Sequence, residues 1–158
     1  MIRLSARDVM TPNVVTLGDH MTTQEVAKFL IEREISGAPV VDELGRLVGV
    51  ISITDIARVA AEPADGLGGQ PTSDFYRADE DEPPTLEDLG QRYVEQHGLP
   101  IRDVMSPVVH AVREATSVAE VARLMIEGHL HRVLVTRGAD AVGIITAMDL
   151  LKVLADAE

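Results

Sequence analysis

The sequence has no cysteine and few aromatic residues, which make up 3% of its 158 positions. Without cysteine there is no disulfide framework, no thiolate nucleophile and no cysteine-ligated metal. The scarcity of aromatic rings argues against the stacking platforms that bind single-stranded nucleic acid. Because 46% of the residues are hydrophobic, we still expect a globular protein, with a core built from Val, Ile, Leu, Ala and Met.

Basic residues are also scarce: 14 Lys and Arg stand against 26 Asp and Glu, which gives a formal net charge of −12. Duplex nucleic acid and anionic membrane surfaces both reward clustered positive charge, so we expect neither as a partner. No apolar run approaches the roughly 18 residues needed to span a bilayer. No signal-peptide core follows the mixed N-terminal residues, so we expect a cytoplasmic protein.

An internal duplication is present. Arg-Asp-Val-Met at residues 7–10 recurs at 102–105, and Glu-Val-Ala at 25–27 recurs at 120–122. A repeat has to be recognised before elements are assigned, because missing it misassigns the whole fold. The duplication predicts a first repeat at residues 1–61, an acidic connector at 62–98 and a second repeat at 99–158.

Each repeat is expected to have the element order strand, helix, strand, strand, helix. Thr22 and Glu25 have the spacing of a capping box before the first helix, and Ser117 and Glu120 repeat that spacing. Two small sheets covered by helices bury more surface together than either does alone. We therefore predict an α+β sandwich of two pseudo-symmetric repeats. The predicted strands are 13–17, 38–41, 46–53, 108–112, 133–136 and 141–146. In the first repeat, the predicted helices run from the cap at Thr22 to about residue 34 and from about 54 to 61. In the second repeat, one helix begins at the cap Ser117 and the closing helix ends at about residue 155.

The connector holds much of the negative charge, because residues 74–95 contain eight acidic residues and two arginines. Its Pro- and Gly-containing first part predicts an irregular connection, and a helix is expected near 85–97. A solvated loop is the favoured interpretation of the acidic run. A partner-docking surface or a cation site remains the alternative.

One motif occurs at the end of the hairpin in both repeats. Gly-Val-Ile-Ser-Ile-Thr-Asp at 49–55 corresponds to Gly-Ile-Ile-Thr-Ala-Met-Asp at 143–149. A strand that ends where a helix begins offers free N–H groups to phosphate, and a nearby carboxylate can hold sugar hydroxyls. The alternative is that the hydroxyl residue caps the helix. For a single copy the cap is the stronger interpretation, but two copies favour an adenine-nucleotide site.

Taken together, these segments resemble a tandem cystathionine-β-synthase (CBS) domain pair, also called a Bateman module. The resemblance implies that the chain binds AMP, ADP or ATP in its clefts, with S-adenosylmethionine and NAD as alternatives. It also implies a homodimer and no required cofactor. The residues that carry it are 8–12, 35–42 and 45–55 with their counterparts in the second repeat.

The resemblance assigns site residues by position. A carboxylate can accept hydrogen bonds from both ribose hydroxyls, and the family's ribose-binding position falls on Asp55 and Asp149. The phosphate-binding candidates are Ser52, Thr146, Arg132 and His131, and the adenine-lining candidates are Thr16, Ala38, Ala111 and Val133. For the four lining residues core packing is the alternative, for Arg132 it is a surface salt bridge, and for His131 it is a structural role.

The two repeats are unequal. Leu134 and Arg137 stand where the first repeat has Pro39 and Asp42, which leaves open whether both clefts bind. No catalytic constellation and no metal site is expected, because no His-Glu-x-x-His pattern is present. Two functions remain: a regulatory adenine-nucleotide sensor, which the residues favour, and a ligand-free dimerisation scaffold that docks a protein partner.

Overall fold

The structure is a computed structural model that describes residues 3–61, 74–76 and 98–157. These residues form two compact units, each described separately below. The N-unit comprises Val15–Val109, and the C-unit comprises Met1–Val14 together with His110–Glu158. Residues 1–14 of the first repeat therefore pack with the second repeat, and residues 99–109 of the second repeat pack with the first.

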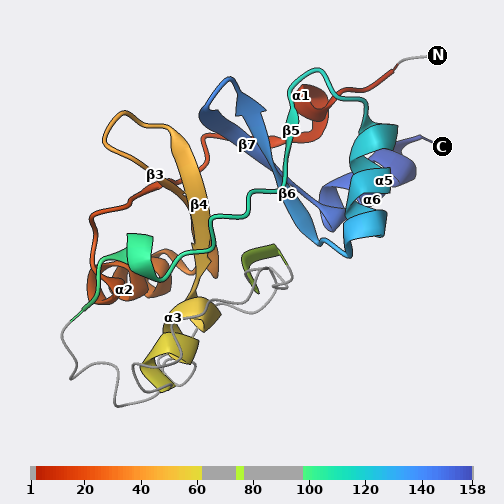
Figure 1. Cartoon of the computed structure of the whole chain (residues 1–158). Helices are drawn as coiled ribbons and strands as arrows, with labels where there is room; N and C mark the ends of the chain where they lie inside the picture. Colours follow the sequence, from red (N-terminus) through yellow and green to blue (C-terminus); the bar gives the residue numbers. More distant parts are fainter. Residues whose placement is uncertain (1–2, 62–73, 77–97, 158) are drawn as a thin grey trace. The chain divides into compact units, whose positions relative to one another are not determined.

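The N-unit contains a three-stranded sheet in the order β2-β3-β4. β2 pairs with β3 in parallel and β3 pairs with β4 antiparallel, while α2 and α3 contact each other (Figure 1). Its main hydrophobic cluster is aliphatic and includes Leu30, Val40 and Ile51, and the aromatic residues Phe75 and Tyr76 are buried as well. The elements are β2 (Leu17–Gly18), α2 (Thr23–Arg33), β3 (Gly37–Val41), β4 (Leu47–Ser52), α3 (Ile53–Ala61) and the 3₁₀ helices η2 (Asp74–Tyr76) and η4 (Ile101–Asp103).

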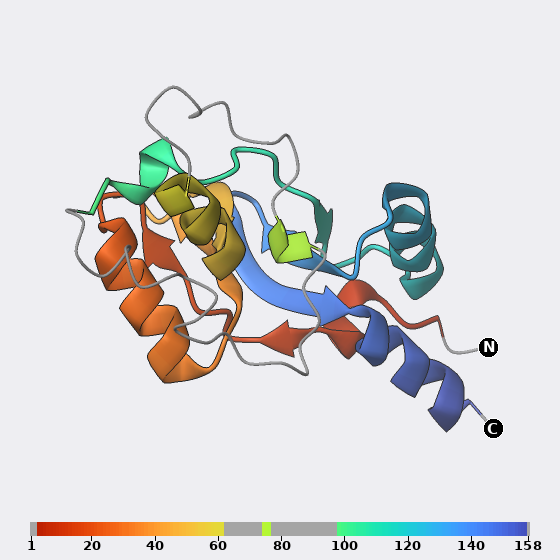
Figure 2. The same ribbon diagram turned by 90° about the horizontal axis from the view of Figure 1, so that it is seen from below.

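The C-unit contains a four-stranded sheet in the order β1-β7-β6-β5. Its N-terminal helix α1 contacts both α5 and α6, which also contact each other (Figure 2). Val121, Val133 and Ile145 are fully buried in this unit. The elements are α1 (Ala6–Val9), β1 (Thr11–Pro12), β5 (Ala111–Arg113), α5 (Val118–Gly128), β6 (Arg132–Arg137), β7 (Asp140–Thr146) and α6 (Ala147–Asp156).

Most of the expected elements are present, and the α+β class is confirmed. Both predicted capping boxes form, at Thr22 with Glu25 and at Ser117 with Glu120. The strand predicted at 13–17 is wrong. Asn13 adopts a φ of 60° and separates β1, which ends at Pro12, from β2, which begins at Leu17. The strand predicted at 108–112 is shortened to β5. The helix expected near 85–97 lies outside the described residues.

The start of each repeat pairs with the hairpin of the other repeat. In the C-unit, β1 lies antiparallel to β7 with Thr11 opposite Ile144. In the N-unit, Ser106 occupies the equivalent place opposite Val50, and their backbone groups exchange two hydrogen bonds of 2.9 Å. This reciprocal exchange is why the compact units do not match the sequence repeats.

The glycine of each repeated motif makes room for the exchanged segment. A Cβ added to Gly49 would lie 2.5 Å from the carbonyl oxygen of Ser106 and 2.9 Å from Sδ of Met105. A Cβ added to Gly143 would meet the side chain of Met10. Only glycine lets another chain segment approach a strand so closely. The motif glycine is therefore explained by packing within each unit.

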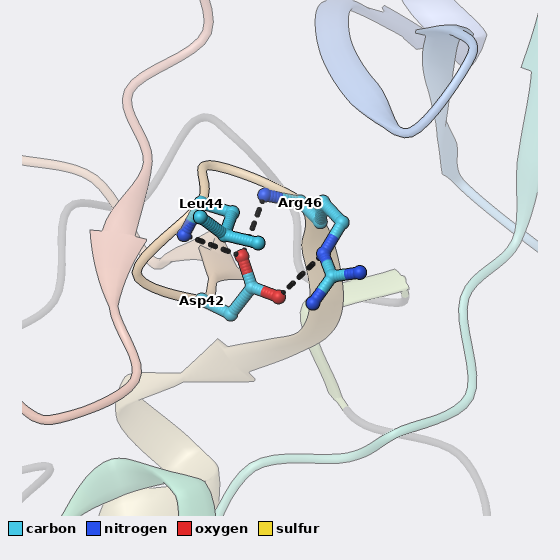
Figure 3. A network of polar contacts seen from close by, with 3 residues as sticks. All are labelled: Asp42, Leu44 and Arg46. Atoms are coloured by element: carbon cyan, nitrogen blue, oxygen red, sulfur yellow. Dashed lines mark hydrogen bonds and ion pairs between the residues drawn. The ribbon is translucent and has the colours of Figure 1, made fainter.

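The hairpin turns of the two units are stabilised by different ion pairs. In the N-unit, Asp42 accepts hydrogen bonds from the N–H groups of Leu44 and Arg46, both at 2.9 Å, and from Nε of Arg46 at 2.8 Å (Figure 3). The backbone N–H of Arg46, its guanidinium and the N–H of Leu44 together hold the pKa of Asp42 below its ordinary value. In the C-unit, Arg137 instead pairs with Glu114 through two bonds of 2.8 and 2.7 Å. The replacement of Asp42 by Arg137 is thus matched by a different partner.

Candidate functional site

The first candidate site lies at the junction between β4 and α3 in the N-unit. The N–H of Ser52 donates to Oδ2 of Asp55 at 2.9 Å, and the N–H of Asp55 donates to Oγ of Ser52 at 3.1 Å. Both residues are buried, and Nη1 of Arg58 lies 3.5 Å from Oδ1 of the aspartate. The pair therefore forms a reciprocal cap on the helix, which is the structural alternative drawn from the sequence.

The second candidate site repeats this arrangement between β7 and α6 in the C-unit. The N–H of Thr146 donates to Oδ2 of Asp149 at 2.9 Å, and the N–H of Asp149 donates to Oγ1 of Thr146 at 3.3 Å. Nζ of Lys152 lies 3.7 Å from Oδ1 of the aspartate. A carboxylate has about four acceptor positions on its two oxygens. Capping the helix therefore leaves each aspartate able to accept further hydrogen bonds.

Arg132 and His131 lie at the end of the same hairpin as Thr146. Arg132 is the register partner of Thr146, and the carbonyl of His131 accepts the N–H of Ala147 at 2.9 Å. The exposed fraction of Arg132 is only 5%, whereas His131 is exposed. Arg132 is therefore a buried basic residue on β6, directly across the hairpin from the residue that caps α6.

The same position in the N-unit carries no charge. Gly37 is the register partner of Ser52, and the carbonyl of Ser36 accepts the N–H of Ile53 at 2.8 Å. The backbone arrangement is the same in the two units, so the difference lies in the side chains. Gly37 cannot be replaced by a larger residue without a shift, because an added Cβ would lie 2.5 Å from the carbonyl oxygen of Ile51.

The four adenine-lining candidates fall into two groups. Ala38 and Val133 are 2% and 0% exposed, and Ala38 belongs to the hydrophobic core of the N-unit. Both pack in the interior, as the alternative interpretation expected. Thr16 is exposed and Ala111 is partly buried. Only these last two offer accessible surface to a ligand.

One feature of the site region is missing from the sequence-based candidates. Phe75 and Tyr76 of η2 are both 0% exposed and lie edge to face with their ring centroids 5.1 Å apart. Cδ2 of Phe75 would lie 2.9 Å from a Cβ at Gly37, and Oη of Tyr76 donates to the carbonyl of Val108 at 3.2 Å. The available signal was an aromatic pair inside an acidic connector of a chain that has only 2 Phe and 2 Tyr.

Metal binding and membrane insertion are two further functions on which the described residues bear. Residues 3–61, 74–76 and 98–157 contain no group of three or more His, Cys, Asp or Glu that could hold a metal ion. Within that same part of the chain, no helix has the length and apolar character required to cross a bilayer.

The fold and the repeated capped aspartate define a tandem α+β repeat module. The CBS domain model matches residues 6–62 and 101–156. Because these matches cover more than half of the chain, it belongs to the CBS domain family. Two CBS domains in one chain confirm the resemblance to a CBS pair drawn from the sequence.

Among curated relatives, the chloroplastic CBS domain-containing protein CBSX2 of Arabidopsis thaliana is 27% identical over 148 residues, which are 92% of this chain and 61% of the relative. The L-aspartate semialdehyde sulfurtransferase of Methanocaldococcus jannaschii is 31% identical over 106 residues, which are 67% of this chain and 21% of that protein. The chain therefore spans less than two thirds of the length of these relatives.

Solved structures share the fold. The crystal structure of CBSX2 in complex with AMP is 23% identical with a TM-score of 0.67, and the match covers 98% of each chain. The CBS domain pair of protein MJ0100, in complex with 5′-methylthioadenosine and S-adenosyl-L-methionine, is 23% identical with a TM-score of 0.67, covering 99% of this chain and 100% of that one. The CBS domain of a membrane protein from Sphaerobacter thermophilus is 31% identical with a TM-score of 0.66, covering 95% and 87%.

Proposed function

We propose that the chain is a regulatory module that binds an adenosyl ligand, namely AMP, ADP or ATP, with S-adenosylmethionine and NAD as alternatives. The observation that carries this proposal is the hydroxyl residue and aspartate held at the same strand-to-helix junction in both repeats. Support comes from the neighbouring structures, one solved with AMP and one with S-adenosylmethionine. A ligand that binds one conformation better shifts the population toward it, which is how such a module reports energy or cofactor state.

The site residues have separate roles in this proposal. Asp55 and Asp149 accept hydrogen bonds from the ribose hydroxyls. Ser52 and Thr146 lie at helix N-termini, where N–H groups and the helix dipole favour phosphate. Arg132 supplies a permanent positive charge with bidentate geometry. His131 follows the same strand end, and Thr16 and Ala111 contact the adenine.

The module is proposed to regulate rather than to catalyse, and to need no cofactor. The relative that is named as a sulfurtransferase is matched over only 21% of its own length, so its activity gives no reason to assign catalysis to this segment. We propose that the protein acts in the cytoplasm. The energy-state signal would pass to a protein target through a change in shape or contacts.

A second candidate function is a homodimeric scaffold. It is favoured by exposed apolar side chains on α5 and α6 of the C-unit. Ile126 is 72% exposed, Leu154 is 68% exposed, and Met148 and Leu151 are each 54% exposed. Apolar groups gathered on two adjacent helices are typical of an association surface. Dimerisation is compatible with ligand binding, so the two functions differ only in whether a ligand is bound.

The proposal is tested by calorimetry and thermal unfolding with AMP, ADP, ATP, S-adenosylmethionine and NAD. A ligand at a hundredfold excess over its Kd should raise the free energy of unfolding by roughly 2.7 kcal/mol. We expect at least one ligand to do so, and the double variant Asp55→Ala/Asp149→Ala to abolish the effect. Asp140→Ala, which removes an exposed carboxylate from β7 of the same unit, is the matched control. If no ligand stabilises the protein, the scaffold function replaces the sensor.

Arg132→Ala tests the phosphate role in the same experiment. A lost charge-assisted hydrogen bond costs about 1.5–3 kcal/mol, so the affinity for a nucleoside phosphate should fall roughly tenfold to a hundredfold. The affinity for the parent nucleoside should fall less. Equal losses for both ligands would refute the assignment, and unfolding without ligand shows whether the variant remains folded.

A further inference from the structure

The two repeats offer different surroundings to a ligand at the same backbone position. Arg132 is opposite Thr146 in the C-unit, whereas Gly37 is opposite Ser52 in the N-unit. We propose that the aromatic pair Phe75–Tyr76 fills the ligand position of the first repeat. The chain then binds a single adenosyl ligand, at the second repeat. This inference rests on the proposed function and specifies where it operates.

Phe75 lies at the strand end that would receive the ligand. A Cβ at Gly37 would be 2.9 Å from Cδ2 of Phe75 and 3.1 Å from Cα of Ser52. The ring therefore packs beside the residue whose hydroxyl begins the capped helix α3. Its 0% exposure means that this contact is enclosed. A phosphate approaching Ser52 along this side of the strand would meet an aromatic ring.

Tyr76 fixes the pair in place. Its Oη donates to the carbonyl of Val108 at 3.2 Å, and its ring lies at 84° to the ring of Phe75. Edge-to-face aromatic pairs are stabilising beyond the area that they bury, and a buried tyrosine hydroxyl needs such a partner. The pair acts as an internal substitute for a ligand within the N-unit.

The described residues of the C-unit offer no aromatic substitute of this kind. The sequence ranges of the C-unit, 1–14 and 110–158, contain neither Phe nor Tyr. In place of Gly37 the C-unit has the buried Arg132, and a guanidinium can bind phosphate in a bidentate manner. The two repeats therefore differ in their side chains at one register position, with an aromatic ring beside Gly37 in one and an arginine in the other.

Calorimetric stoichiometry tests the inference, with whichever of AMP, ATP or S-adenosylmethionine binds the wild-type chain. We expect one ligand per chain for the wild type and none for Asp149→Ala. The double variant Phe75→Ala/Tyr76→Ala should bind two ligands, and adding Asp55→Ala should return it to one. Two ligands on the wild type, or binding that survives Asp149→Ala, would overturn the inference. Those wild-type and Asp149→Ala measurements stand even if the double variant fails to fold.

A ligand-free measurement separates this inference from the proposed function. Replacing the other tyrosine, Tyr93→Phe, leaves Tyr76 as the sole tyrosine. We expect its fluorescence to be several-fold less sensitive to acrylamide than that of free tyrosine, and to become sensitive after Phe75→Ala. If acrylamide quenches Tyr76 in the Tyr93→Phe protein as strongly as it quenches free tyrosine, the aromatic pair is not enclosed, and this result holds whether or not a ligand binds. Protected fluorescence with no ligand bound to any variant refutes the sensor function instead.

Discussion

Gly49 and Gly143 occupy the same motif position, yet their neighbours differ in kind. Gly49 faces the backbone carbonyl of Ser106 as well as Met105, whereas the close neighbours of Gly143 are side-chain atoms of Met10. A flexible methionine can move aside more readily than a hydrogen-bonded backbone segment. The same substitution should therefore have unequal effects in the two repeats.

We predict that Gly49→Ala lowers the free energy of unfolding by about 1–3 kcal/mol, the range found for overpacked interiors, and that Gly143→Ala lowers it less. Urea denaturation measures both. Adding Met10→Ala should relieve the Gly143→Ala strain, while Met105→Ala should leave most of the Gly49→Ala strain because the Ser106 carbonyl remains. If both glycine variants lost the same free energy of unfolding, and both methionine substitutions restored it equally, this explanation would be wrong.

Single residues also show what the sequence could reveal about the site. The pairing of a hydroxyl residue with an aspartate three positions later predicts a capped helix from local spacing alone, and both caps form. The burial of Arg132 could not be predicted, because it depends on the hairpin register that puts it opposite Thr146. The enclosure of Phe75 against Gly37 likewise depends on a contact between distant parts of the chain.

Each hairpin turn has an ion pair whose carboxylate has a lowered pKa. Asp42 lies in the turn between β3 and β4, whereas Glu114 follows β5 and pairs with Arg137 at the turn between β6 and β7. Hydrogen bonds from Arg46 and Leu44 lower the pKa of Asp42 from 3.8, and the Arg137 guanidinium lowers the pKa of Glu114 from 4.5. Each group binds its proton less readily in the folded chain than in the unfolded chain. Its stabilising contribution is therefore present above the ordinary pKa and disappears as the pH falls through the lowered value.

We predict that Asp42→Asn makes the stability of the protein less dependent on pH below about 4, because the variant has no carboxylate to protonate at this turn. Urea denaturation from pH 6 to pH 3 provides the measurement. Glu43→Gln removes the same charge from the same turn without the hydrogen bonds seen at Asp42 (Figure 3). If the stability of Asp42→Asn fell with pH as steeply as that of the wild type, the Asp42 carboxylate would not contribute to the pH dependence.

Sequence reasoning was more accurate for long elements than for short ones. The helices α2 and α5 are specified by local capping boxes and apolar spacing, and they begin where expected. The first predicted strand of each repeat was too long, because only β2 (Leu17–Gly18) and β5 (Ala111–Arg113) form there. A separate segment, Thr11–Pro12 in one case and Ser106 in the other, pairs with the hairpin of the other repeat. Local periodicity carries no information about such an exchange.

At the scale of the whole molecule, the exposed apolar side chains of α5 and α6 bear on assembly. We predict that Ile126→Glu combined with Leu154→Glu converts a homodimer into a monomer, because a charge in an apolar contact is costly to desolvate. Sedimentation velocity measures the change. Leu44→Glu, at a 76% exposed turn position in the N-unit, is the matched control and should leave the dimer intact. A dimer that survives the double substitution would place the contact elsewhere.

The reciprocal exchange of first strands has a consequence for the order in which the chain folds during synthesis. The N-unit is one continuous stretch, Val15–Val109, so every residue it needs is translated before residues 110–158. The C-unit instead joins residues 1–14 to residues 110–158, and so α1 and β1 must wait for β7 and α6 to appear. Residues 1–14 are thus made before the N-unit, but they find their partners only after all residues of the N-unit have been made.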